Sequence, residues 1–167
     1  MVTSGINQKS SSKMKRIIKN IFIKYLQEPE EAVIENKNEK YKKSGLTHEH
    51  AFEIRQRIQA AFEQDKIYRN NEVGLLELAN HIGQDRYKVS EVINKYYSQN
   101  FYSLLNHYRI SEAKELLLNH QFLSVKAIMY EVGFNSKNSF YNAFKKDTGL
   151  SPNDFRTIGS FQAQTAI

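Results

Sequence analysis

The stretch Gly74-Leu75-Leu76-Glu77-Leu78-Ala79-Asn80-His81-Ile82-Gly83 has a counterpart fifty residues later, Ser124-Val125-Lys126-Ala127-Ile128-Met129-Tyr130-Glu131-Val132-Gly133. Each stretch begins at a residue that can cap a helix, contains about two turns of helical pattern and ends at a glycine. A second, polar helical stretch then begins near Asp85 in the first case and near Ser136 in the second. A helix, a tight glycine turn and a polar-faced helix form a helix-turn-helix unit, whose second helix can lie in the major groove of DNA. Two such units in one chain point to a protein that binds double-stranded DNA.

The segments around the two units are predicted to be helices that hold them together. Thr47 is a suitable N-cap for a helix that runs to about Lys66. The stretch Phe101–Asn119 has the pattern of one long helix between the units, and Ser151-Pro152 begins a last helix. The residues expected to face inward from the first two of these helices are Ala51, Phe52, Ile54, Ile58, Ala61 and Phe62, and Phe101, Leu104, Leu105, Tyr108, Ala113, Leu116 and Leu117.

The two units, Gly74–Tyr96 and Ser124–Asp147, superpose better when one residue is inserted in the second turn. The side chains then predicted to be equivalent and buried are the pairs Val89 and Phe140, Ile93 and Phe144, and Leu104 and Phe155. The helix between the units would be roughly 27–28 Å long at 1.5 Å per residue. Major grooves recur about every 34 Å on one face of DNA, so the second helices could enter two successive grooves. The sequence predicts an all-α fold of about seven helices, in which a long central helix joins two helix-turn-helix units.

Charge is distributed unevenly along the chain. The 167 residues carry a formal net charge of +6, with ten basic against five acidic residues in Met1–Gly45 and fourteen against thirteen in Leu46–Ile167. We therefore divide the chain into a basic, largely flexible segment over 1–45, a DNA-binding domain over 46–157 and a frayed tail over 158–167. The basic apolar stretch Arg16–Leu26 predicts a short helix in the first segment. A basic face on the nearly neutral domain must come from segregation of charge rather than from its excess.

Several classes of function find no support in the sequence. Without cysteine, disulfides and thiolate metal sites are excluded, and no run of 18 apolar residues is present to span a membrane. The five histidines form no His-Glu-x-x-His motif, and there is neither a glycine-rich phosphate loop nor a nucleophile elbow. We expect no enzyme activity, no metal, no cofactor and no small-molecule site.

Many spaced residues resemble a known family. The C-terminal motif of AraC/XylS-type transcription regulators is matched by Glu131-Val132-Gly133-Phe134, Ser139-Phe140, Phe144-Lys145-Lys146, Gly149-Leu150-Ser151-Pro152 and Phe155-Arg156. Its first half is matched by Leu78-Ala79, Arg109-Ile110, Glu112-Ala113 and Leu116-Leu117-Leu118, so that the resemblance covers about Gly74 to Arg156. The lead-in Tyr41–Leu46 is similar to the subgroup common in Bacteroidetes, in which a multi-helix membrane portion often precedes the domain. The resemblance implies a seven-helix domain that binds DNA through both units and usually activates transcription.

Contacts with DNA bases are expected on the second helix of each unit, on the side away from the buried residues. The candidates are Arg86, Tyr87, Ser90 and Glu91 in the first unit, and Lys137, Asn138, Tyr141 and Asn142 in the second. Asn138 and Asn142 lie one turn apart, and an amide pairs with adenine through two hydrogen bonds. Glu91 stands where relatives often carry a basic or amide residue, and its carboxylate would either accept from cytosine or repel phosphate. The alternative for the whole set is an ordinary solvated helix face.

A second group of residues is expected to contact phosphates. It comprises Lys88, Lys95, Lys145 and Lys146, for which ordinary surface lysines are the alternative, and the helix-opening residues Gly74 and Ser124 with their backbone N–H groups. Arg109 and Arg156 lie among apolar residues, where an unpaired charge is costly, so we expect both to have structural partners.

We therefore interpret the chain as a bacterial, cytoplasmic and nucleoid-associated transcription regulator, and as an activator, that binds specific sequences of double-stranded DNA. RNA polymerase is a further expected partner. The competing hypothesis is a helical protein-interaction module of a signalling system that binds DNA only weakly. The chain has no room for the large sensor domain typical of the family. Its signal then enters through a membrane-associated or sensor partner, or it is a small autonomous regulator, or it is a fragment of a tethered membrane protein with residues 1–45 as a membrane-proximal remnant.

Overall fold

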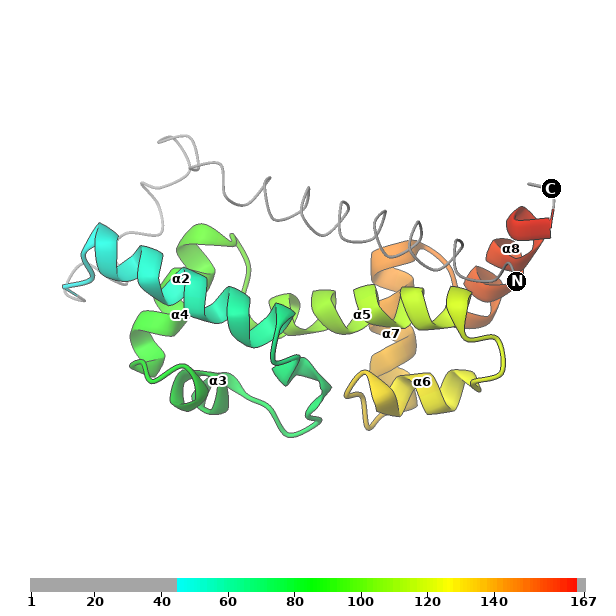
Figure 1. Cartoon of the computed structure of the whole chain (residues 1–167), viewed down its shortest axis with the longest axis horizontal. Coiled ribbons are helices and arrows are strands. Elements are labelled where there is room, and N and C mark those ends of the chain that lie inside the picture. The colour runs from blue at the N-terminus through cyan, green and yellow to red at the C-terminus, as the bar shows by residue number, and fades with distance from the viewer. Residues whose placement is uncertain (1–44, 165–167) are drawn as a thin grey trace, which may run out of the picture.

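Seven α-helices and one 3-10 helix make up the part of the chain that the structure, a computed structural model, describes, residues 45–164 (Figure 1). In chain order they are α2 (His48–Glu63), η3 (Ile67–Arg69), α3 (Leu75–His81), α4 (Arg86–Tyr96), α5 (Phe101–Asn119), α6 (Val125–Glu131), α7 (Lys137–Thr148) and α8 (Pro152–Gln164). The predicted all-α fold, with two helix-turn-helix units joined by a long central helix, is confirmed. The short helix predicted within Arg16–Leu26 lies outside the described residues.

Capping side chains and glycines set the ends of these helices. The N-cap side chains of Thr47, Asp85, Asn100, Ser124 and Ser136 each accept a hydrogen bond from a backbone N–H two or three residues later. This satisfies donors that the first turn of a helix leaves without a partner. In both units the first helix is followed by a glycine with positive φ, Gly83 at 63° and Gly133 at 91°. The repeat recognised in the sequence is thus a repeat of helix, turn and helix in the structure.

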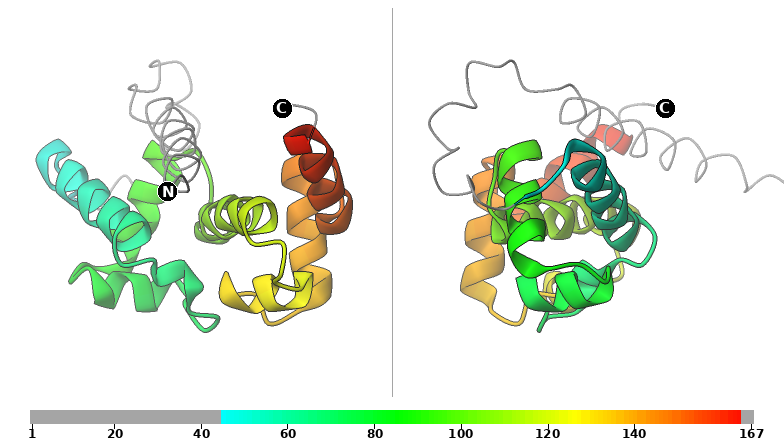
Figure 2. Two further views of the ribbon diagram at one scale, coloured as in Figure 1. Left: turned by 45° about the vertical axis from the view of Figure 1, so that its right-hand side comes forward. Right: turned by 90° about the vertical axis from the view of Figure 1, so that its left-hand side faces the viewer.

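Helix α5 is a common wall of two hydrophobic clusters. Its N-terminal half contributes to the cluster that includes side chains of α2, α3 and α4, through Phe101, Leu104 and Leu105. Its C-terminal half contributes to the cluster of α6 and α7, through Ile110, Ala113 and Leu117. At about 100° per residue these two sets point in nearly opposite directions. Figure 2 accordingly shows α2–α4 on one side of α5 and α6–α8 on the other.

The side chains predicted to be equivalent in the two units occupy equivalent places. Val89, Ile93, Phe140 and Phe144 are fully buried. Leu104 is buried as well, whereas Phe155 is partly buried and packs against the second cluster. The two recognition helices, as we call α4 and α7, are therefore fixed to α5 by corresponding turns. In Figure 1, α3 and α6 lie along the lower edge of the molecule, and α4 and α7 run upward from that edge, roughly perpendicular to α5.

Three local expectations differ from the structure. Helix α2 ends at Glu63 rather than near Lys66. Phe52 is 50% exposed, because two residues of helix turn it about 200° away from the buried Ile54. Helix α8 continues to Gln164, into the segment 158–167 that was predicted to be a frayed tail. Gly159 lies directly against Cδ2 of Leu118, so this glycine permits a close approach of α8 to α5 instead of ending the helix.

Candidate nucleic-acid interface

The outward face of α7 is polar and open to solvent. Lys137, Asn138 and Asn142 are exposed, and Tyr141 beside them is partly buried. Lys137 Nζ lies 5.4 Å from the centre of the Tyr141 ring, a distance at which a cation is attracted to the aromatic face. The residues of α7 that are buried are Phe140 and Phe144, and Asn138 and Asn142, each two residues before one of them, point about 200° away from it. The structure thus brings the predicted base contacts of the second unit together on one surface, and their contact with bases stays a prediction.

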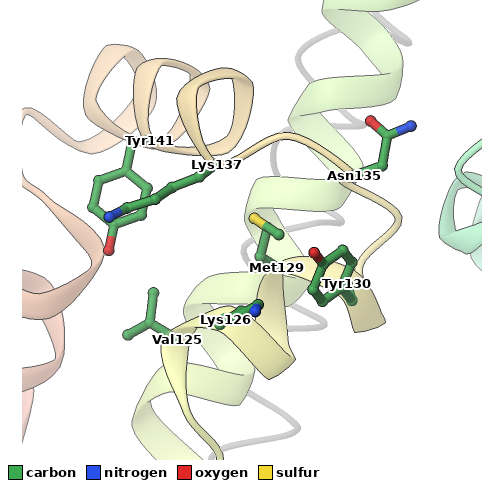
Figure 3. Close-up of a pocket in the computed structure, with 7 residues that line it drawn as sticks. All are labelled: Val125, Lys126, Met129, Tyr130, Asn135, Lys137 and Tyr141. Atoms are coloured by element: carbon green, nitrogen blue, oxygen red, sulfur yellow. The ribbon is translucent and has the colours of Figure 1, made fainter.

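A cavity of about 330 Å³ lies beside this face, between α6 and α7 (Figure 3). Its lining combines the predicted base contacts Lys137 and Tyr141 with residues of α6 and of the turn, namely Val125, Lys126, Met129, Tyr130 and Asn135. Lys126, Tyr130 and Asn135 are exposed side chains that were not predicted as contacts, because they lie outside the second helix of either unit. The sequence did show that these three residues of α6 and of the turn before α7 are polar, and this could have indicated that they are exposed.

The face of α4 offers fewer side chains than that of α7. Arg86 and Tyr87 are exposed and associated, with Arg86 Nη2 donating to Tyr87 Oη at 3.0 Å and the guanidinium 4.7 Å from the ring centre. Ser90 is partly buried. Glu91 is only 5% exposed, so the expectation that it faces outward is wrong. Helix α4 buries Val92 as well as the residues predicted to be buried, because α2 packs against it in addition to α3 and α5.

The residues expected to contact phosphates are also placed unequally. Lys95, Lys145, Lys146 and Ser124 are exposed, whereas Lys88 and Gly74 are partly buried. The backbone N–H of Gly74 donates to Oε2 of Glu77 at 2.9 Å. This N–H is therefore already bonded, and the Glu77 carboxylate places a negative charge where a phosphate was expected. A phosphate at Gly74 would have to displace this carboxylate, and the phosphate contacts of the whole set stay predictions.

The two arginines among apolar residues differ. Arg109 is 7% exposed and donates from Nε to the carbonyl of Tyr68 at 2.8 Å and from Nη2 to that of Asn70 at 2.9 Å. Burial lowers the pKa of Arg109 to about 10, so its guanidinium is charged at neutral pH. Its expected structural partners are confirmed. Arg156 is different, because Nε and Nη2 are buried without a hydrogen-bond partner. The apolar neighbours of Arg156 in the sequence indicated that its guanidinium is partly buried, but they did not indicate which group accepts its hydrogen bonds.

An ion-pair cluster surrounds η3 between the two units. Glu112 of α5 is 8% exposed, with its Oε1 2.7 Å from Lys66 Nζ and its Oε2 accepting from Arg69 Nε at 3.0 Å. A second bond joins Arg69 Nη2 to Oε1 of Glu112, and Arg69 Nη1 lies 3.1 Å from Oε1 of Glu131 in α6. Burial alone would raise the pKa of Glu112, but the hydrogen bonds from Arg69 and Lys66 hold it below its ordinary value. We call Lys66, Arg69, Arg109, Glu112 and Glu131, together with the backbone of η3, the η3 junction.

The C-terminal turn of α7 is tied to α5. Lys114 Nζ lies 2.7 Å from Oδ2 of Asp147, and both side chains are only about a quarter exposed. Burial lowers the pKa of the neighbouring His107, although Asp147 acts in the opposite direction. At neutral pH this histidine is therefore uncharged, and Lys114 is the cation that holds Asp147.

Comparison with known proteins places this geometry in a family. A family model described as a helix-turn-helix domain matches residues 78–158. The C-terminal domain of AraT, a response regulator from Geobacillus stearothermophilus, is 27% identical and has a TM-score of 0.56, over 68% of this chain and 88% of that one. Residues 78–158 belong to the AraC family of helix-turn-helix regulators. Domains of this family bind DNA, which assigns the AraC-type domain to the DNA-binding transcription regulators.

Two further relatives support the assignment. The C-terminal domain of the two-component response regulator yesN from Fusobacterium nucleatum is 26% identical with a TM-score of 0.55, over 61% of this chain and 96% of that one. An uncharacterized HTH-type transcriptional regulator from Pseudoalteromonas carrageenovora is 47% identical over 53 residues. The latter match spans 31% of this chain and 30% of that regulator, so it concerns the AraC-type domain and not the relative as a whole.

Two structural features are absent from the described residues. No helix there is long and apolar enough to cross a membrane. In the same part of the chain, no group of three or more His, Cys, Asp or Glu residues is placed to hold a metal ion.

Proposed function

We propose that the protein regulates transcription by binding specific sequences of double-stranded DNA, with α4 and α7 in two successive major grooves. The observation that carries this proposal is the repetition of one unit on both sides of α5 (Figure 2), with exposed polar side chains along α7 and at the beginning of α4. A helix with such a face can place its side chains against base edges, while lysines around it neutralise phosphates.

The second unit is proposed to contribute most of the base discrimination. Asn138 and Asn142 lie on the exposed face of α7, where their amides can pair with adenine. The neighbouring cavity between α6 and α7 has an apolar part near Met129, suited to the methyl group of thymine, and a polar rim. In the first unit, Glu91 is buried and is no longer proposed as a base contact, whereas Arg86, Tyr87 and Ser90 remain proposed base contacts. Lys88, Lys95, Lys145, Lys146 and Ser124 are the proposed phosphate contacts.

The remaining parts of the proposal concern the cellular role. The protein is a bacterial activator that acts at the nucleoid in the cytoplasm, contacts RNA polymerase and catalyses no reaction. Its signal comes from a membrane-associated or sensor protein. Support for these points comes from the family alone, in which activation of transcription is usual.

The test is selection of binding sites from a randomised duplex library by the purified chain at about 150 mM salt, where non-specific binding is weak. We expect enrichment of two short blocks about one helical turn apart. A single enriched block would restrict base contact to one unit. Absence of any enriched sequence would overturn the proposal and favour the protein-interaction module.

Substitutions on α7 should separate base contact from phosphate contact. Asn142→Ala is expected to reduce discrimination at one or two base pairs by about 1–3 kcal/mol, because an amide contact with one base edge is lost. Lys146→Ala should weaken all duplexes alike and lower the slope of log K against log salt by about 1. Equilibrium binding to the selected site and to single-base variants at several salt concentrations measures both effects. Asn153→Ala, in the exposed first turn of α8, is the control and should change neither. Identical behaviour of Asn142→Ala and Lys146→Ala would contradict the division of roles.

A further inference from the structure

We infer that the η3 junction fixes the relative position of the two recognition helices, and that the spacing between two DNA blocks is thereby part of the specificity. The inference rests on the proposed function for its DNA part. The juxtaposition that carries it is the packing of η3, a segment that lies between α2 and the first unit in the sequence, against α5 and the turn of the second unit. In Figure 1 the segment between α2 and α3 lies below α5, between α3 and α6.

The first set of contacts attaches η3 to α5. Arg109 holds the carbonyls of Tyr68 and Asn70, and Glu112 binds Arg69 through two hydrogen bonds and Lys66 through a third. Arg109 and Glu112 lie three residues apart on α5 and are both buried. The Glu112 side chain is only 7% exposed, so removing one of its cationic partners leaves a buried charge with fewer bonds, although Arg69 and Lys66 themselves are 38% and 44% exposed. With Arg109 bonded to two backbone carbonyls as well, several bonds at once restrain η3, unlike an isolated surface ion pair.

The second set of contacts crosses to the second unit. Arg69 Nη1 reaches Glu131 at the end of α6. A Cβ placed on Gly133, in the turn before α7, would lie inside van der Waals contact of the Tyr68 carbonyl and 2.9 Å from that of Arg69. Phe134 follows in the same turn, with its ring centre 5.2 Å from the Arg109 guanidinium. The backbone of η3 thus packs on the backbone of the turn that precedes α7 and sets the direction of this helix.

This arrangement gives the two units a second connection besides α5. A single helix can bend and can splay the units attached to its opposite faces. A contact between the units beside the helix, made here by η3, opposes both movements. Without the junction, the distance between the recognition helices would depend on α5 alone.

The consequence for DNA follows from its geometry. One inserted base pair moves a block by about 3.4 Å along the axis and rotates it by roughly a tenth of a turn. A rigid pair of recognition helices cannot follow this movement without losing base contacts or deforming the DNA. A loosened pair can follow it. Spacing preference therefore reports the rigidity of the junction.

The first experiment uses the free protein. The sequence contains no cysteine, so Lys95→Cys and Lys146→Cys introduce two unique attachment points for spin labels, one on each recognition helix. We expect a narrow distribution of label distances that broadens when Arg69→Gln is added. The matched control is Arg57→Gln, because Arg57 of α2 is similarly exposed and bonds to Glu53 in the same helix and to the carbonyl of Ile82 in the first unit, neither of which belongs to the second unit. The control should leave the width unchanged. An unchanged width in Arg69→Gln would overturn the inference, whatever the outcome of the DNA experiments.

The second experiment measures binding to duplexes with one base pair inserted between the two selected blocks. The unaltered chain should lose about tenfold or more in affinity, the scale of one lost base contact, and Arg69→Gln only about threefold. Affinity for a duplex with a single block should be the same for both proteins, and Arg69→Lys should restore part of the spacing preference. A purely structural role would instead lower the single-block affinity, which would contradict the inference.

If Arg69→Gln does not fold, Glu131→Gln replaces it. Glu131 lies at the end of α6, is half exposed and contributes only its bond to Arg69. Failure of the unaltered chain to select any site would count against the proposed function. The role of the η3 junction would then be tested by the distribution of label distances alone.

Discussion

Gly133→Ala is expected to lower the free energy of unfolding by about 3 kcal/mol or more, a loss that places it among the severe single substitutions. The φ angle of Gly133 is +91°, a conformation that costs a residue with a Cβ roughly 1–2 kcal/mol. The new Cβ would also meet the backbone carbonyls of Tyr68 and Arg69 and lie 3.0 Å from Arg109 Nε. Backbone cannot rotate away as a side chain can, so the turn or η3 must shift. Urea denaturation followed by circular dichroism measures the loss.

Gly149→Ala is the control that separates strain from contact. Gly149 has a φ of +76°, yet nothing lies within 4 Å of the position that a Cβ would take. Its replacement should therefore cost only the backbone term, about 1–2 kcal/mol. The difference between the two variants measures how tightly η3 packs on the turn of the second unit. Equal losses would contradict the close contact described here.

Phe144→Ala is expected to destabilise the protein by about 3–5 kcal/mol, the range found when a buried aromatic ring is deleted. Phe144 is fully buried, with ring centres of Phe140 and Phe155 at 5.8 and 5.4 Å. Its loss leaves a cavity where α7 meets α8, so the face that carries Asn142 should lose its fixed position. Thermal and urea unfolding give the stability.

Phe122→Ala is the matched control for this deletion. Phe122 is 82% exposed in the connection between α5 and α6, so removing its ring creates no cavity. Its effect should stay within about 0.5 kcal/mol, as for most surface substitutions. A loss for Phe144→Ala no larger than that of the control would show that the second cluster is not organised around the phenylalanines of α7.

Local patterns in the sequence were sufficient for the elements and for the buried side of each unit. Capping residues such as Ser124 act on the N–H groups of the next turn, and the spacing of Phe140 and Phe144 follows from the helical repeat. The four base contacts predicted on α7 are gathered on one face for the same reason. Each of these inferences depends on residues a few positions apart, which is the range over which a sequence pattern is informative.

The features that the sequence did not reveal depend on distant segments. Glu91 has the spacing of an outward residue, yet it is buried, on a helix that α2, α3 and α5 all contact. The η3 junction joins Arg69 to Glu112 and Arg109 to Tyr68 across about forty residues, and nothing in the Ile67–Arg69 segment announces those partners. The cavity beside α7 likewise needs α6 as its other wall. Composition could not supply these contacts, because they exist only once the helices are placed against one another.

The position of α5 between two clusters bears on how the protein folds. One face of its N-terminal half completes the core of the first unit, and the opposite face of its C-terminal half completes that of the second. Melting this helix from either end would expose apolar surface of a unit that is otherwise intact. Loss of either core therefore removes support from the other, and the two units are expected to unfold in one cooperative transition. The repeat is visible in the sequence, but it is not divisible: a chain shortened to one unit would have to keep α5 with half of its apolar surface facing water.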